Sequence, residues 1–270
     1  MKFYRLFPSF MILTFFFIPN FLFCSTSSIV PIYKLVDESD IVFKGTVTSA
    51  LFVFDDPRLQ DNSGGVNVSE GNYGTLFEIK VNKVLYANET IKQAIFSKRR
   101  IVDINEDLKK NPKRKPVKLF AFRSDQGRGG LGGPEYYSDE LQLYFLKVSK
   151  FPAQIPSTAL IVHENWSPNG SDFPILTKSD LKEEHCFEAA RAQYQSTWVL
   201  SDKWFKKRLP TVEAFCEVMS IPNPCRREQE LRRLLNSMDK HLAANAAAAL
   251  RKIERTRKAK QTQLRLEQKR

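Results

Sequence analysis

The sequence is poor in the residues that build metal and catalytic sites. Its 270 residues include three histidines and four cysteines. No Cys-x-x-Cys pair occurs and no two histidines lie at helical spacing, so the common local zinc-site patterns are excluded. Asp55, Asp56 and Asp61 do not have the spacing of an EF-hand loop. We therefore expect no metal site, no cofactor and no catalytic constellation.

Beyond the N-terminus, the sequence also lacks an apolar run long enough to span a bilayer. The N-terminus has Lys2 and Arg5, then the apolar run Leu6–Phe23 and the small residues of Cys24–Ser28. This order is typical of a secretory signal peptide in residues 1–28. The apolar run is of nearly spanning length, so an uncleaved membrane anchor is the alternative. Either interpretation predicts export, to the periplasm or the extracellular space, with membrane contact only through this segment if it is retained.

Positive charge is concentrated in two segments of the chain. The net charge is +12. The segment Lys98–Lys118 has nine basic and three acidic residues, a surplus of six positive charges. The segment Arg251–Arg270 has nine basic and two acidic residues, a surplus of seven. Together these surpluses account for the whole net charge. Such local charge predicts attachment to an anionic partner, and the alternative is a solvated loop with a disordered or helical tail. The candidate polyanion-binding residues are Lys98, Arg99, Arg100, Lys109, Lys110, Lys113, Arg114, Lys115, Arg255, Arg257, Lys258 and Lys260.

Alternating apolar and polar residues predict a β-domain before Pro174. Gly45 interrupts the first run and indicates a bulge or a barrel bend. In the second run, one face is expected to carry Phe77, Ile79, Val81 and Leu85. The run Glu140–Val148 is apolar on both faces, which favours a central strand. The expected strands are Ile41–Phe54, Leu76–Leu85, Ile101–Ile104, Val117–Phe122, Glu140–Val148 and Ala159–His163, after a short helix over Ile32–Asp40.

After Pro174 the apolar residues recur every three or four positions, which predicts helices. The first two are expected over Ser179–Thr197 and Thr211–Ser220. A third begins near Cys225 and a fourth continues into the charged tail. Their expected buried residues are Leu231, Leu234, Leu235 and Met238, then Leu242, Ala246, Ala249, Leu250 and Ile253.

Cysteine spacing predicts one disulfide in the helical region. Cys216 and Cys225 lie on either side of a Pro-Asn-Pro turn that would bring two helices together, so we expect them to pair. This pairing leaves Cys186 without a disulfide partner, and we interpret it as a buried thiol. Its neighbour His185 is poorly placed to act as its base, because adjacent residues of a helix point in different directions.

The strand pattern resembles a known kind of exported domain. Five or six strands, one helix and long polar loops are similar to an oligonucleotide/oligosaccharide-binding (OB) barrel. The segments Ser39–Thr48, Phe77–Leu85 and Leu141–Leu146 resemble exported bacterial proteins with such a barrel, and these resemble the netrin-like domain of tissue metalloproteinase inhibitors. Those inhibitors use an N-terminal cysteine tied by disulfides to the barrel. Here Cys24 has no cysteine in the barrel region to pair with, so no inhibitory residues are carried over.

The predicted fold is mainly β with α: an OB-like five- or six-stranded antiparallel barrel followed by a helical C-terminal region. The expected division is 1–28 as signal peptide or N-terminal anchor, 29–176 as OB-like barrel, 177–253 as helical region and 254–270 as basic tail. Within the helical region, Leu234–Ile253 resembles one unit of a HEAT-type repeat. No second copy is evident, and a helical hairpin docked on the barrel is the plainer interpretation.

The function hypothesis is an exported, non-enzymatic binding or interaction protein that engages an anionic envelope surface or a protein partner. Nucleic acid is not expected, because an exported protein rarely meets it. One alternative is a hydrolase-type enzyme that uses Cys186 or His163 with a carboxylate such as Glu164. Another is a protease inhibitor that acts through the barrel edge, which rests on the resemblance alone.

Overall fold

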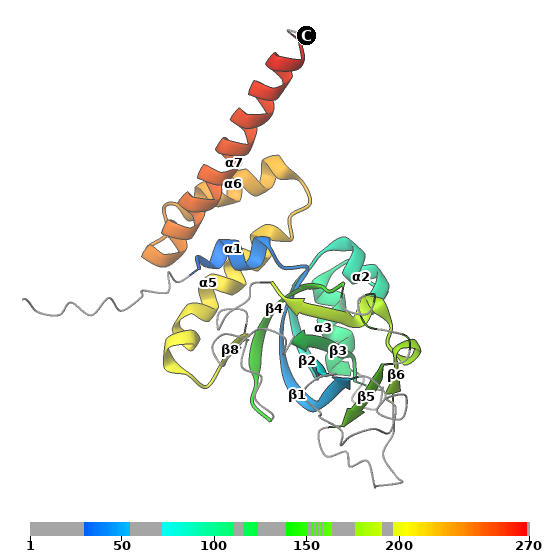
Figure 1. Ribbon diagram of the computed structural model, residues 1–270. Coiled ribbons are helices and arrows are strands. Elements are labelled where there is room, and N and C mark those ends of the chain that lie inside the picture. The colour runs from blue at the N-terminus through cyan, green and yellow to red at the C-terminus, as the bar shows by residue number, and fades with distance from the viewer. Residues whose placement is uncertain are drawn as a thin grey trace, which may run out of the picture.

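The computed structural model describes residues 30–54, 72–110, 116–123, 139–150, 153, 155, 157, 159–163, 176–190 and 197–268. The predicted signal peptide or anchor lies outside these ranges. The strands are β1 (Ile41–Phe54), β2 (Asn72–Ala87), β3 (Lys118–Arg123), β4 (Gln142–Val148), β5 (Leu160–His163), β6 (Leu176–Thr177), β7 (Cys186–Ala189) and β8 (Thr197–Val199). The helices are α1 (Ile32–Asp37), α2 (Glu89–Phe96), α3 (Ile101–Lys110), α5 (Lys203–Met219), α6 (Pro224–Leu234) and α7 (Lys240–Glu267), with 3-10 turns η2 (Lys178–Asp180) and η3 (Glu183–His185). Figure 1 shows the strands gathered together and α7 extending away from the rest of the molecule.

Five strands close into a barrel in the order β1-β2-β3-β7-β4, with β4 pairing back onto β1. Four of these pairings are antiparallel, and the β3–β7 pairing is parallel. The barrel with a helical C-terminal region is confirmed, although its sheet is mixed instead of wholly antiparallel. A closed five-stranded mixed barrel is consistent with an OB-like fold. β5 and β6 extend the sheet beside β1, and β8 lies on β4.

The alternation in β1 places its two faces in two different cores. Ile41, Phe43 and Val47 point into the barrel, and Val42 points outward into the core shared with the helices. Gly45 lies where β1 pairs with both β2 and β4. A Cβ atom there would lie 2.7 Å from the Lys80 carbonyl oxygen, so only glycine permits this close approach. The bend predicted at Gly45 is accompanied by a register shift between Lys44 and Gly45.

A second register shift corrects the predicted face of β2. Val42 pairs with Tyr86 and Phe43 pairs with Val84, so β2 has an extra residue at Leu85. The bulge sends Val84 into the barrel and Leu85 outward into the core shared with the helices. The expectation that Leu85 shares a face with Phe77, Ile79 and Val81 was therefore wrong.

The segment predicted as a strand at Ile101–Ile104 is the first turn of α3. Four residues were too few to separate a period of two from a helical period. Ile104 is buried against the barrel. Asn105 ties α3 to the bulge of β2, because its Oδ1 accepts from the Val84 N–H and its Nδ2 donates to the Val84 carbonyl, both at 2.8 Å. α3 thus covers the end of the barrel interior.

The helix predicted over Ser179–Thr197 was also wrong, because this segment supplies the closing strand β7 and the edge strand β8. Phe187 points into the barrel, whereas Cys186 points to a separate apolar cluster with Leu51 and Val53. The spacing of apolar residues by three and four in this segment was a coincidence. β7 gains its hydrogen-bond partners from β3 and β4, which are distant in sequence.

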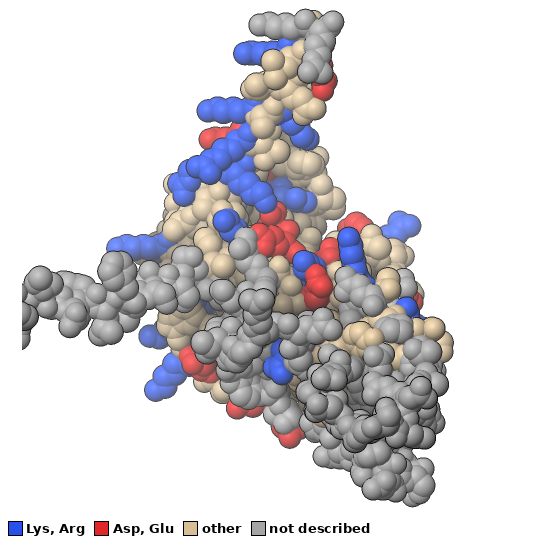
Figure 2. Space-filling view, in the orientation of Figure 1, with Lys and Arg blue, Asp and Glu red and all other residues tan. Residues whose placement is uncertain are grey.

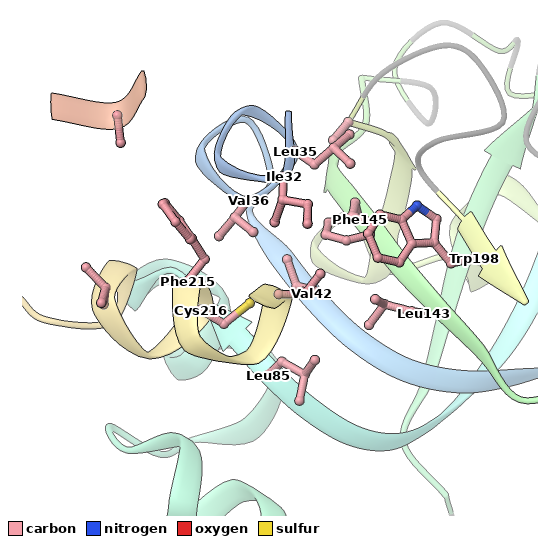
Figure 3. Close-up of a cluster of buried hydrophobic side chains, with 14 of the residues drawn as sticks. Ile32, Leu35, Val36, Val42, Leu85, Leu143, Phe145, Trp198, Phe215 and Cys216 are labelled. Atoms are coloured by element: carbon pink, nitrogen blue, oxygen red, sulfur yellow. The ribbon is translucent and has the colours of Figure 1, made fainter. Parts of the chain in front are cut away.

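The helices pack on the outer surface of the barrel around one shared core (Figure 3). Val42, Leu143 and Phe145 of the barrel face α1 and α5 there, with Phe215 contributed by α5. Phe215 is fully buried, a burial that stabilises the fold by about 1.5–3 kcal/mol. The helical region is thus fixed to the barrel by apolar packing.

Two predictions about the helical region are corrected by burial. The disulfide between Cys216 and Cys225 is wrong, because both thiols are free, with Cys216 buried and Cys225 exposed. Cys225 is the second residue of α6, after the Asn223 N-cap and Pro224, and its side chain is exposed to solvent. Met238 and Leu235, predicted as buried, are exposed, because they follow the end of α6 at Leu234 and are not part of its buried face. Leu231 is buried as predicted.

Candidate polyanion-binding surface

The two basic segments lie on different elements. Lys98, Arg99 and Arg100 lie between α2 and α3, and Lys109 and Lys110 end α3. The predicted residues Lys113, Arg114 and Lys115 lie outside the described residues, and Arg255, Arg257, Lys258 and Lys260 lie on α7. α3 packs on β2, whereas α7 packs on α6 and α1. The described parts of the two segments therefore form two separate surfaces.

Most of the basic residues around α3 are paired with carboxylates of the same helix. Ion pairs join Lys98 to Asp107 at 3.0 Å, Arg100 to Asp103 at 2.5 Å and Lys110 to Glu106 at 2.8 Å. Among the described residues, Arg99 and Lys109 have no such partner. The α3 surface is consequently less cationic than its sequence indicates.

On α7, two cations hold the helix in place. Lys252 pairs with Asp37 of α1, and Arg257 pairs with Glu228 of α6 at 2.8 Å. Hydrogen bonds from Arg232 and Arg257 lower the pKa of Glu228, so this carboxylate is ionised at neutral pH. Arg257, one of the predicted binding residues, is therefore engaged within the protein.

Five other cations of α7 share one side of the helix. At 100° per residue, they lie within about 80° of one another around the helix axis. We call this set the cationic face of α7, and it consists of Lys240, Arg251, Arg255, Lys258 and Arg265. All five are exposed, and none has an acidic partner in the described part of the chain. Lys260, also predicted, lies on the opposite side of the helix.

The cationic face continues beyond the body of the protein. Every described residue from Glu254 to Gln268 is exposed, and Arg257 alone among them makes an ion pair with another helix, to Glu228 of α6. Figure 2 shows Lys and Arg side chains standing out along this projecting part. From Lys240 to Arg265 the face spans roughly 37 Å, at 1.5 Å per residue. Its length and its lack of internal partners suit a large anionic surface.

The sequence of α7 explains why its exposed C-terminal part stays helical. Alanine and unbranched polar residues dominate it, and both have high helix propensity. Its N-cap Asp239 accepts hydrogen bonds from the His241 and Leu242 N–H groups. Burial alone would raise the pKa of Asp239, but these bonds and one from Thr211 together lower it. α7 is thus capped at its first turn, and its first half packs on the body through the buried Ala246 and Leu250.

A third basic cluster was missed by sequence reasoning. The first two turns of α5 carry Lys203, Lys206, Lys207 and Arg208 around Trp204. The Arg208 guanidinium lies 3.9 Å from the centre of the Trp204 ring, and burial lowers the pKa of Arg208. The sequence does contain four cations within six residues here. A count of net charge does not detect them, because acidic residues elsewhere in the chain offset their charge.

The described residues bring together no catalytic group. Cys186 is 0% exposed, and its Sγ donates to the Lys182 carbonyl at 3.5 Å, inside an apolar cluster. His185 Nδ1 lies 3.2 Å from the Lys118 carbonyl oxygen instead of near a thiol. The side chain of His163 lies outside the described residues, as do Glu164 and the aspartates after β1. Within the described ranges, no three His, Cys, Asp or Glu side chains are grouped so that they could hold a metal ion.

Comparison of the chain with protein-family models, curated proteins and solved structures gives no match in any of the three. Among the helices that the structure describes, none combines the length and apolar character needed to cross a membrane.

Proposed function

We propose that this protein is an exported, non-enzymatic binding protein that attaches to an anionic surface of the cell envelope through the cationic face of α7. The observation that carries this proposal is a row of five exposed cations without acidic partners, on a helix that projects from the body. Placement in the periplasm or outside the cell rests on the N-terminal sequence, with its short basic start and single apolar run. In those compartments, anionic lipid head groups and surface polymers are available as partners.

The arrangement of charge favours a surface over a small anion. A small anion is bound by converging donors, whereas these cations lie in a row along one side of a straight helix. Each Lys or Arg near an anionic lipid surface contributes about 1 kcal/mol. If three of the five touch the surface at once, the contribution is about 3 kcal/mol, or roughly a hundredfold in affinity. Exposed charges of this kind are screened by salt within about 10 Å at 0.1 M ionic strength.

The resemblances noted in the sequence support a binding role. An OB-like barrel similar to exported bacterial proteins and to netrin-like domains would serve as a body that presents loops and helices. The pair α6 and α7 packs together, as the helices of a HEAT-like unit would. Protease inhibition through the barrel edge draws no support from the cysteines, because Cys186 is buried and the other two described cysteines lie on α5 and α6.

The proposal is tested by removing the cationic face and measuring attachment to two anionic probes, phosphatidylglycerol vesicles and inorganic polyphosphate. One variant replaces all five face residues by glutamine: Lys240, Arg251, Arg255, Lys258 and Arg265. The matched control removes the same number of charges around α3, at Lys98, Arg99, Arg100, Lys109 and Lys110. We expect the wild type to bind at low salt and to release at high salt. The face variant should bind roughly a hundredfold more weakly, and the α3 variant should bind nearly as well as the wild type.

Two results would contradict the proposal. One is a wild type that binds neither probe at low salt. The other is a face variant that binds as tightly as the wild type while the α3 variant does not, which would move the binding surface to α3.

A further inference from the structure

The basic cluster of α5 includes an exposed aromatic residue. Trp204 is 42% exposed, and around it lie four cations without acidic partners in the described ranges. Trp204 is held in place by a chain of rings that reaches the core. Its ring meets the Phe205 ring edge-on at 4.7 Å, and Phe205 stacks on the buried Trp198 at 5.2 Å. The indole is therefore displayed in a fixed position beside positive charge.

Met238, between α6 and α7, is fully exposed as well. The next residue, Asp239, accepts a hydrogen bond from Thr211 Oγ1 of α5 at 3.2 Å. Thr211 is buried and follows Trp204 by seven residues, which is two helical turns or about 10 Å along α5. Lys207, four residues before Thr211, is exposed between them. The exposed Trp204 thus lies about two helical turns along α5 from the contact that fixes the segment carrying the exposed Met238.

This region adjoins the cationic face of α7. Lys240, the first residue of that face, directly follows Asp239, the residue that contacts α5. The N-terminal end of α1 is close to the same part of α7, because the Tyr33 N–H donates to Asn245 Oδ1 at 3.1 Å. α7, which carries the cationic face, therefore begins beside both α5 and α1.

We infer that the anionic surface is a lipid bilayer, and that Trp204 and Met238 enter its head-group region while the surrounding cations contact the lipid phosphates. This inference rests on the proposed function and names its partner. A soluble polyanion would account for the cations, but it would leave the exposed indole and thioether in water. Trp is enriched at the membrane–water interface because its ring is apolar and its N–H is polar. Lys and Arg beside exposed apolar side chains are typical of elements that lie in that interface.

The experiment uses the full chain with vesicles of phosphatidylglycerol and phosphatidylcholine, with or without brominated acyl chains that quench tryptophan emission. Flotation measures binding, and quenching measures the depth of the indole. A Trp204→Phe variant identifies the quenched tryptophan, and a W204A/M238A variant tests the apolar contribution. Val102→Ala is the control, because Val102 is 63% exposed on α3, away from this region.

We expect bromolipid to quench the bound wild type and not Trp204→Phe. The W204A/M238A variant should partition about tenfold more weakly than the wild type, with Val102→Ala unchanged. Binding without quenching, or quenching that persists in Trp204→Phe, would overturn the inference and leave the proposed function standing. Binding to inorganic polyphosphate but not to vesicles would also overturn the inference of a lipid bilayer and leave the proposed function standing. Binding to neither probe would remove the proposed function together with the inference.

Discussion

Replacing Gly45 by alanine tests how the barrel closes. Gly45 pairs with Val81 of β2 and with Gln142 of β4, so β1 has a strand on each side at this point. The added methyl group would lie 2.7 Å from the Lys80 carbonyl oxygen and 2.9 Å from a side-chain carbon of Ile79. The carbonyl is part of the backbone, so β1 and β2 must move apart. Overpacking of this kind costs about 1–3 kcal/mol, and a weakened hydrogen bond of the ladder adds about 1 kcal/mol.

The expected loss is therefore about 2–4 kcal/mol in the free energy of unfolding, or roughly 5–15 °C in Tm for a chain of this size. Urea denaturation followed by circular dichroism measures it. Ser49→Ala in the same strand is the control, and we expect it to stay within about 0.5 kcal/mol of the wild type. A Gly45→Ala protein as stable as the control would refute the close approach of β1 and β2.

Three further predictions concern the helices. The pKa of Glu228 lies below its unfolded value of 4.5, so its pairing with Arg257 is fully present above pH 4.5 and is lost as the pH falls through the lower folded value. The protection of α7 backbone amides against hydrogen exchange, relative to their intrinsic rates, should fall in that acid range. Glu228→Gln should abolish this pH dependence of the protection. Iodoacetamide should label Cys225 in the native protein but Cys216 only after unfolding, because burial raises the pKa of the Cys216 thiol; peptide mapping that finds the two joined by a disulfide would contradict this. Asn105→Ala should cost about 2–4 kcal/mol in urea denaturation, since it leaves both backbone groups of a buried bulge without partners, and an unchanged midpoint would argue against the docking of α3.

The barrel could be predicted where local alternation decides the structure. Ile41, Val42 and Phe43 alternate between two cores, and the alternation can be predicted because the three residues are consecutive in the sequence. The closing strand β7 could not be predicted in this way. Its four residues are held by β3 and β4, and such long-range pairing leaves no periodic signal in so short a segment. Likewise, the strand predicted over Ile101–Ile104 is the start of α3, and the residue that fixes this helix, Asn105, bonds to Val84, 21 positions away.

The candidate surface was predictable in part. The concentration of basic residues after Arg251 is visible in the sequence, and so is the helical period before it. Which cations stay free could not be predicted, because the partner of Lys252 is 215 positions away and that of Arg257 is 29 away. The exposure of Met238 depends on where α6 ends, and an apolar residue near a helix terminus gives no local sign of pointing to solvent.

Charge reversal on both sides of the contact tests the central claim most directly. Glutamate is placed at the five positions of the cationic face: Lys240, Arg251, Arg255, Lys258 and Arg265. Far-ultraviolet circular dichroism confirms that α7 stays helical, and flotation compares vesicles of anionic and of cationic lipid. We predict that the reversed protein leaves anionic vesicles and binds cationic ones, while the wild type does the opposite. A reversed protein that still binds anionic vesicles as tightly as the wild type would contradict the role of this face.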